Sequence, residues 1–128
     1  MRFTQDISYR YGGNIILVRV DLKQDYIDTE NRLQKLPEDP KLQFKRRFIS
    51  VCEDMFIKFT DCYVIDVAKR YYASDSHHGG ADIARYEAEF YRQAAEHMTH
   101  IMSGYSKKLY DQVDERYMVF RDLRLGRK

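Results

Sequence analysis

The sequence has no tryptophan, only two prolines, two cysteines and six glycines among its 128 residues. With so little proline and glycine, few positions would break a helix or form a tight turn. Cys52 and Cys62 would lie about 15 Å apart on one helix, whereas a disulfide needs Cα atoms within about 7 Å. We therefore expect two free thiols and a reducing, cytoplasmic setting.

Long apolar runs are also missing. No stretch approaches the roughly 18 apolar residues of a membrane-spanning helix, and the first residues, Met1 to Asp6, lack the apolar region of a signal peptide. We therefore expect no membrane partner. The net charge of +2 does not by itself indicate nucleic acid. With 44% hydrophobic and 33% charged residues, the composition is globular, and the length suits one domain over residues 1–128.

What the sequence does contain is aromatic residues at helical spacing. There are 11 tyrosines and seven phenylalanines, and apolar residues recur every three or four positions along most of the chain. We predict an all-α, antiparallel four-helix bundle that buries Tyr and Phe. The predicted elements are an N-terminal arm or β-hairpin (1–13), four helices (about 14–36, 40–73, 82–103 and 106–124) and a basic tail (125–128).

The first helix has a competing interpretation. The β-branched run Ile15–Val20 would also suit a short hairpin around Gly12 and Gly13. A longer helical stripe, with Asn14 as its N-cap, favours the helix. That stripe consists of Ile15, Val18, Leu22, Tyr26, Thr29, Leu33 and Leu36.

Breaks separate the other helices. Pro37 ends the first helix, and Asp39 with Pro40 begins the second. The polar segment 74–80 predicts a turn between two antiparallel helices. Gly104 ends the third helix and Ser106 caps the fourth, although one continuous helix from Asp82 to Arg124 is the alternative. The second helix has an apolar stripe of Ile49, Cys52, Phe56, Phe59, Tyr63 and Val67.

Basic residues interleaved with aromatic ones are the main functional signal. Such clusters bind phosphates through counterion release, and aromatic rings stack on unpaired bases. Because the bundle is antiparallel, we expect two basic patches, with the starts of the second and fourth helices at one end and the tail at the other. The predicted nucleic-acid contacts are Lys41, Lys45, Arg46, Arg47, Lys107, Lys108, Arg116, Arg121, Arg124, Arg127 and Lys128.

Two weaker signals involve the third helix. His97 and His100 are neighbours on one helix face, but nothing in the spacing supplies further metal ligands, so we predict no metal and no cofactor.

The segment Arg92–His97 resembles the short motif of HEPN ribonucleases, helical dimers that pair Arg and His across their interface. That resemblance implies RNA cleavage by Arg92 and His97. The two residues point about 140° apart on a helix, and ion pairs explain Arg92 equally well.

The overall layout resembles another group. A helix ends at Leu33-Gln-Lys-Leu-Pro37, a basic-aromatic helix follows, and a last short helix comes after Gly104-Tyr105-Ser106. This resembles the four-helix-bundle proteins of ribosomal-RNA intervening sequences and the accessory proteins of diversity-generating retroelements. The resemblance covers residues 26–124 as layout only, and Leu36 stands where the family has phenylalanine. It implies basic homo-oligomers that bind nucleic acid and a protein partner.

The leading hypothesis is a non-enzymatic accessory or adaptor, homo-oligomeric, that binds RNA or DNA through its basic surfaces. A protein-only binding module or complex subunit, and the ribonuclease, are the alternatives. The tyrosines exceed what a thin bundle buries. We therefore expect part of the aromatic surface, Tyr71, Tyr72, Tyr86 and Tyr110, to be covered only by a partner.

Overall fold

A computed structural model describes residues 15–76, 80–104 and 107–126. These residues form a mixed α/β fold, so the predicted all-α four-helix bundle is wrong. The predicted arm, Asn14, Ser106 and the end of the basic tail lie outside the described residues. In chain order the elements are β1 Ile16–Val18, β2 Asp25–Ile27, β3 Leu33–Lys35, α2 Leu42–Phe59, β4 Tyr63–Ile65, the 3-10 turn η1 Ala68–Arg70, β5 Ala73–Ser74, α3 Ala88–Met102, β6 Leu109–Tyr110 and α4 Glu115–Arg124.

The main sheet has three parallel strands in the order β1-β4-β6. In its register Val64 of β4 lies opposite Leu17 on one side and Leu109 on the other. Val64 and Ile65 are both buried. A parallel strand covered on both faces is apolar throughout, and this explains the uninterrupted run Tyr63–Ile65 at the centre of the sheet.

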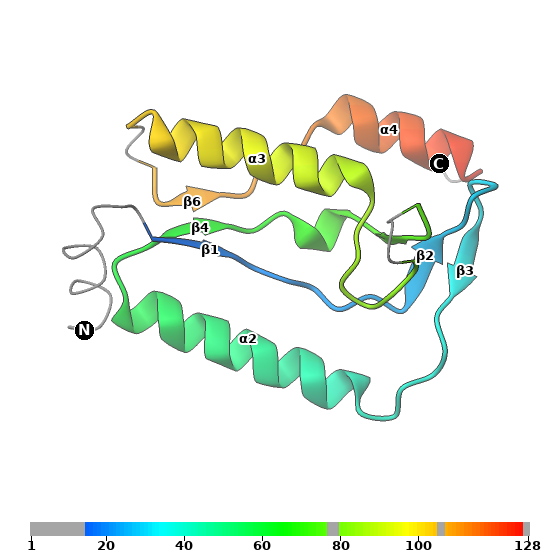
Figure 1. The fold of residues 1–128 in the computed structure, drawn as a ribbon, viewed down its shortest axis with the longest axis horizontal. Helices are drawn as coiled ribbons and strands as arrows, with labels where there is room; N and C mark the ends of the chain where they lie inside the picture. Colours follow the sequence, from blue (N-terminus) through cyan, green and yellow to red (C-terminus); the bar gives the residue numbers. More distant parts are fainter. Residues whose placement is uncertain (1–14, 77–79, 105–106, 127–128) are drawn as a thin grey trace.

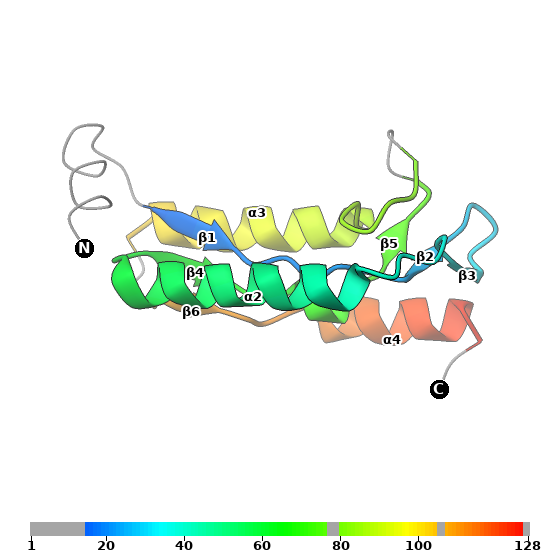
Figure 2. The same ribbon diagram turned by 90° about the horizontal axis from the view of Figure 1, so that it is seen from below.

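Helices α2 and α3 lie on opposite faces of this sheet (Figure 1). Figure 2 shows α2 from below, in front of the strands, with α4 beyond the end of the sheet. The main hydrophobic cluster lies on the α3 and α4 side: it contains Ile65 of β4, Ile101 of α3 and Met118 of α4. None of the helices in the described ranges is long and apolar enough to cross a membrane.

A second, smaller sheet has the order β3-β2-β5. Strands β2 and β3 form a hairpin whose turn is held by Asp28: its Oδ1 accepts hydrogen bonds from the backbone N–H groups of Glu30 and Arg32, each at 2.9 Å. Asn31 has φ = 59°, a left-handed conformation that Asn tolerates better than most residues. The hairpin occupies the sequence predicted as the first helix, which is therefore wrong.

The predicted helix 40–73 is also wrong in its second half. A helix does begin after Pro40, but α2 ends at Phe59 and Thr60 is extended (φ −134°, ψ 134°). The predicted stripe continued through Tyr63 because every position of a buried parallel strand is apolar. A continuous apolar run always has apolar residues at helical spacing, so periodicity alone does not distinguish a buried strand from a helix.

The C-terminal half follows the prediction more closely. Helix α3 covers residues 88–102 of the predicted 82–103, and Gly104 takes the positive φ (88°) typical of a helix end. The predicted break between the third and fourth helices is confirmed. The stretch predicted as the fourth helix contains strand β6 before α4 begins, with Asp114 as N-cap.

The chain buries several of its aromatic side chains, as predicted. Three of the tyrosines that were expected to need a partner for their burial are covered by the chain itself. Tyr71, Tyr86 and Tyr110 are at most 6% exposed within the chain itself. Phe90 packs edge-on against Tyr71, with ring centroids 5.8 Å apart, and 4.3 Å from Tyr86. Among the described residues, the exposed aromatic side chains are Phe44, Phe48 and Phe59 of α2, Tyr91 of α3 and Phe120 of α4.

Candidate nucleic-acid interface

A cleft rich in charged side chains lies beside α2, at the carboxyl ends of β1 and β4. Ligands in open α/β sheets bind at this edge, where the loops after the strands diverge. The cleft has a volume of about 490 Å³. It is lined by Arg19, Val20, Asp21, Leu22, Gln43, Arg46, Arg47, Ile49, Ser50, Glu53, Asp66 and Lys69.

Arg46 comes from the inner side of α2. Its Nε and Nη2 both donate hydrogen bonds to the backbone carbonyl of Leu22, at 2.9 and 2.7 Å. This carbonyl belongs to the loop after β1, so the contact joins α2 to the edge of the sheet. Because the acceptor is neutral, the positive charge of Arg46 is held in place without being neutralised.

Arg47 and Lys69 add two further charges. Arg47 follows Arg46 on α2, and Lys69 lies in η1, the turn after β4. Both side chains are exposed, and neither forms a hydrogen bond or ion pair with any described residue. The cleft therefore brings together three cations from two distant segments, all without a carboxylate partner in the described structure.

The carboxylates of the cleft are mostly neutralised by other bases. Asp21 binds the ammonium of Lys23 at 2.7 Å. Glu53 accepts from the guanidinium of Arg19 at 3.2 Å and from the backbone N–H of Val20 at 3.0 Å. Among the described residues, this leaves Asp66 as the acid of the cleft with no internal partner. Burial lowers the pKa of Lys23 although Asp21 opposes the shift. The groups without an internal partner thus favour an anion.

A second hollow of about 480 Å³ adjoins the first and shares Asp21, Arg46 and Lys69 with it. Arg121 lies at its margin, but its side chain is only 6% exposed. Its guanidinium donates to Glu87 at 2.7 Å and to the Arg70 carbonyl at 2.9 Å. Arg121, predicted as a surface contact, is instead part of a buried ion pair.

The remaining predicted contacts do not form the two expected patches. Lys41 and Lys45 are exposed at the start of α2, and Arg116 and Arg124 are exposed on α4. Lys107 and Lys108 directly precede β6 in the chain, and β6 lies at the opposite end of the molecule from the start of α2 (Figure 1). Lys108 binds Asp61 at 3.0 Å. Arg127 and Lys128 lie outside the described residues.

The basic residue that sequence reasoning missed is Lys69. The predicted helix 40–73 placed Lys69 near its C-terminal end, far from Arg46 and Arg47. The chain reverses between α2 and β4, and this reversal brings η1 beside α2. No local signal in the sequence marks that reversal beyond the polar pair Thr60-Asp61.

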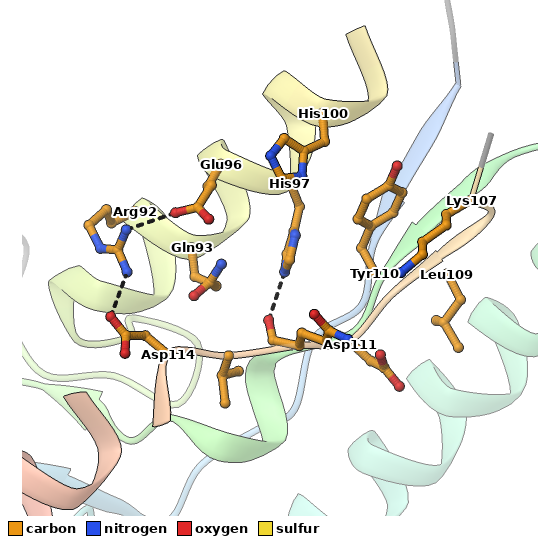
Figure 3. Close-up of a pocket in the computed structure, with 12 residues that line it drawn as sticks. Arg92, Gln93, Glu96, His97, His100, Lys107, Leu109, Tyr110, Asp111 and Asp114 are labelled. Atoms are coloured by element: carbon orange, nitrogen blue, oxygen red, sulfur yellow. Dashed lines mark hydrogen bonds and ion pairs between the residues drawn. The ribbon is translucent and has the colours of Figure 1, made fainter. Parts of the chain in front are cut away.

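Arg92 and His97 line a separate cleft of about 470 Å³ between α3 and the loop after β6 (Figure 3). Arg92 is bound by Glu89, by Glu96 at 2.9 Å and by Asp114 at 3.6 Å. The hydrogen bond with Glu89 is the main cause that raises the pKa of Arg92. The two residues therefore share a cleft within one chain, although helical geometry predicted that they diverge.

His97 is nearly buried, and its Nε2 lies 2.8 Å from the carbonyl oxygen of Gln112. Since a carbonyl only accepts, Nε2 carries the proton, and the buried Nδ1 has no partner among the described residues. His100 lines the same cleft (Figure 3). Across residues 15–76, 80–104 and 107–126, no three His, Cys, Asp or Glu side chains are grouped so that they could hold a metal ion.

Comparison of the chain with protein-family models, with curated proteins and with solved structures gave no significant match. The four-helix bundle implied by the layout resemblance is wrong. Function therefore has to be argued from the clefts and surfaces themselves.

Proposed function

We propose that this protein is a non-enzymatic binding module that holds the phosphate backbone of a nucleic acid in the cleft beside α2. The observation that carries the proposal is the convergence of Arg46, Arg47 and Lys69, three cations without carboxylate partners. Guanidinium groups donate two parallel hydrogen bonds to phosphate oxygens, and lysine supplies a point charge. Arg46 is already oriented by Leu22, so binding needs little reordering of its side chain.

Basic groups near the cleft favour a polymeric anion over a small one. Lys41 and Lys45 lie on the same end of α2 and extend the positive surface beyond the cleft. Lys45 also binds Asp39 at 2.6 Å, but the Lys45 side chain remains 47% exposed. A chain of phosphates would contact both the cleft and this end of the helix.

The proposal is tested by fluorescence anisotropy with labelled single-stranded RNA, single-stranded DNA and duplex DNA over a salt series. We expect binding that weakens linearly in log affinity against log salt. Replacing both Arg47 and Lys69 by Ala removes two phosphate contacts. For a single strand the slope should then fall by about 1.4, with an affinity loss of about tenfold or more.

Lys58→Ala is the matched control, because Lys58 is an exposed base on the same helix outside the cleft. It should leave affinity and slope nearly unchanged. If the double variant binds as tightly as the parent chain, or if the parent binds none of the three nucleic acids at low salt, the proposal is wrong.

The ribonuclease hypothesis remains a prediction that the same samples test. RNA incubated with the parent chain should be cleaved if Arg92 and His97 form a catalytic pair, and Arg92→Ala should abolish that cleavage. The existing contacts of Arg92 with three carboxylates favour a structural role for it, so we expect intact RNA.

A further inference from the structure

Helix α2 carries an apolar stripe on the side turned away from the sheet. The stripe consists of Phe44, Phe48, Val51, Met55 and Phe59. These residues are separated by four, three, four and four positions, so they lie on one helix face. The rings of Phe44 and Phe48 stack on each other, with centroids 6.1 Å apart, yet both remain open to solvent. The exposed fractions are 69% for Phe44, 60% for Phe48, 50% for Val51, 55% for Met55 and 47% for Phe59.

A contiguous apolar face of this kind is typical of an interaction surface. Its five apolar residues lie outside the cleft, which is lined by Arg46, Ile49 and Glu53 of the same helix, and Arg47 lies between the two surfaces. The first four stripe positions, Phe44 to Met55, follow the alternating four-three spacing of the core positions in a coiled coil. The stripe therefore suits a second helix lying nearly parallel to α2.

The charges beside the stripe indicate which helix that is. Lys45 and Arg47 flank its first half, and Asp54 flanks its second half. Asp54 binds Arg19 at 2.8 Å but keeps 63% of its side chain exposed, so a second cation has access to it. Arg47 and Asp54 are seven residues apart on the same side of the stripe, so two copies of α2 running in opposite directions can set the arginine of each beside the aspartate of the other.

We propose that two copies of this protein pair through the outer faces of α2 in an antiparallel, twofold-symmetric dimer. In the register that matches the apolar positions, Phe48 packs on Val51 of the second copy and Phe44 packs on Met55. Arg47 then lies beside the second copy's Asp54, and symmetry forms the same pair twice. In the same register Lys41 lies opposite the second copy's Lys58, so these like charges stay solvated at the ends of the contact that runs from Phe44 to Met55.

The test is the mass of the full chain in solution against concentration, measured by sedimentation without nucleic acid. We expect a dimer at micromolar concentration and a monomer on dilution. Phe48→Asp buries two charges at the centre of the interface and should weaken the dimer by about 100-fold or more. Val119→Asp, at an apolar residue of α4 that is 60% exposed, is the matched control and should leave the mass unchanged.

Charge reversal tests the register. Arg47→Asp alone and Asp54→Arg alone should each weaken the dimer by about tenfold, and the two substitutions together should restore it. Circular dichroism of each variant checks that the fold is retained. A monomer at every concentration, a dimer indifferent to Phe48→Asp, or a double reversal that fails to restore association would each overturn the proposal. The first outcome would assign the stripe to another segment of the chain or to a different protein.

Discussion

Helices α2 and α3 cover opposite faces of the same sheet, but they are packed very differently. Helix α3 buries Phe90, Gln93, Ala94, His97 and Ile101, whereas α2 buries only Leu42. Both helices carry enough apolar residues to face a core. The difference shows that the α3 face provides the main core of the described chain, while much of the apolar surface of α2 remains available to another molecule.

Replacing one phenylalanine on each helix should give the largest difference in the free energy of unfolding between the α3 side and the α2 side. Phe90→Ala removes a 5%-exposed ring that contacts Tyr71 and Tyr86, so we expect a loss of about 3–5 kcal/mol in the free energy of unfolding. Phe48→Ala should change monomer stability by about 0.5 kcal/mol or less. Urea denaturation at a protein concentration below dimerisation measures both. Equal losses would contradict the contrast between the faces.

The buried ion pair of the α3 side gives the next largest effect. Arg121→Ala leaves Glu87, which is 4% exposed, without its cation, and we expect a loss of about 3 kcal/mol. Tyr117 and the backbone N–H of Tyr72 still donate to that carboxylate. Arg116→Ala, on the exposed side of α4, is the control and should be nearly silent in thermal denaturation.

Alkaline pH should ionise the buried tyrosines packed with α3, whereas α2 contains no tyrosine. Burial raises the pKa of Tyr71 and of Tyr86 to about 12. The unfolded chain releases these protons near pH 10, as free tyrosine does. The contribution of these two tyrosines to stability is therefore constant below about pH 10 and is lost as the pH rises toward about 12. Melting temperatures over this range measure the decline.

Tyr71→Phe sharpens that experiment. The Tyr71 hydroxyl is buried and has no hydrogen-bond partner among the described residues, so its removal should not destabilise the protein at neutral pH. The decline above pH 10 should become shallower. An unchanged slope would show that Tyr71 does not contribute to it.

Several elements follow from the sequence because their signals are local. Pro40 and the residues around it mark the start of α2, and Gly104 marks the end of α3, since both act through backbone dihedrals. Burial of aromatic residues follows from their number. Arg46 and Arg47, two of the three cations in the cleft, belonged to the basic cluster that sequence analysis singled out.

The parallel sheet does not follow from the sequence in the same way. Strands β1, β4 and β6 are each two or three residues long, too short for an alternating pattern to appear. Their pairing partners are remote, so no turn motif joins them. Lys69 was missed for the same reason: its place in the cleft depends on that pairing.

The order β1-β4-β6 also has a consequence for how the protein folds. The central strand bonds to one segment near residue 17 and to another near residue 109, so no short piece of the chain contains a complete sheet. During synthesis, β1 emerges first and has no sheet partner until β4 has been made. Pairings between remote segments fold slowly, because loops must close before the contacts form. Until α3 and β6 have been made, Val64 and Ile65 of β4 lack their cover, so the newly synthesised chain is more prone to aggregation than the finished fold.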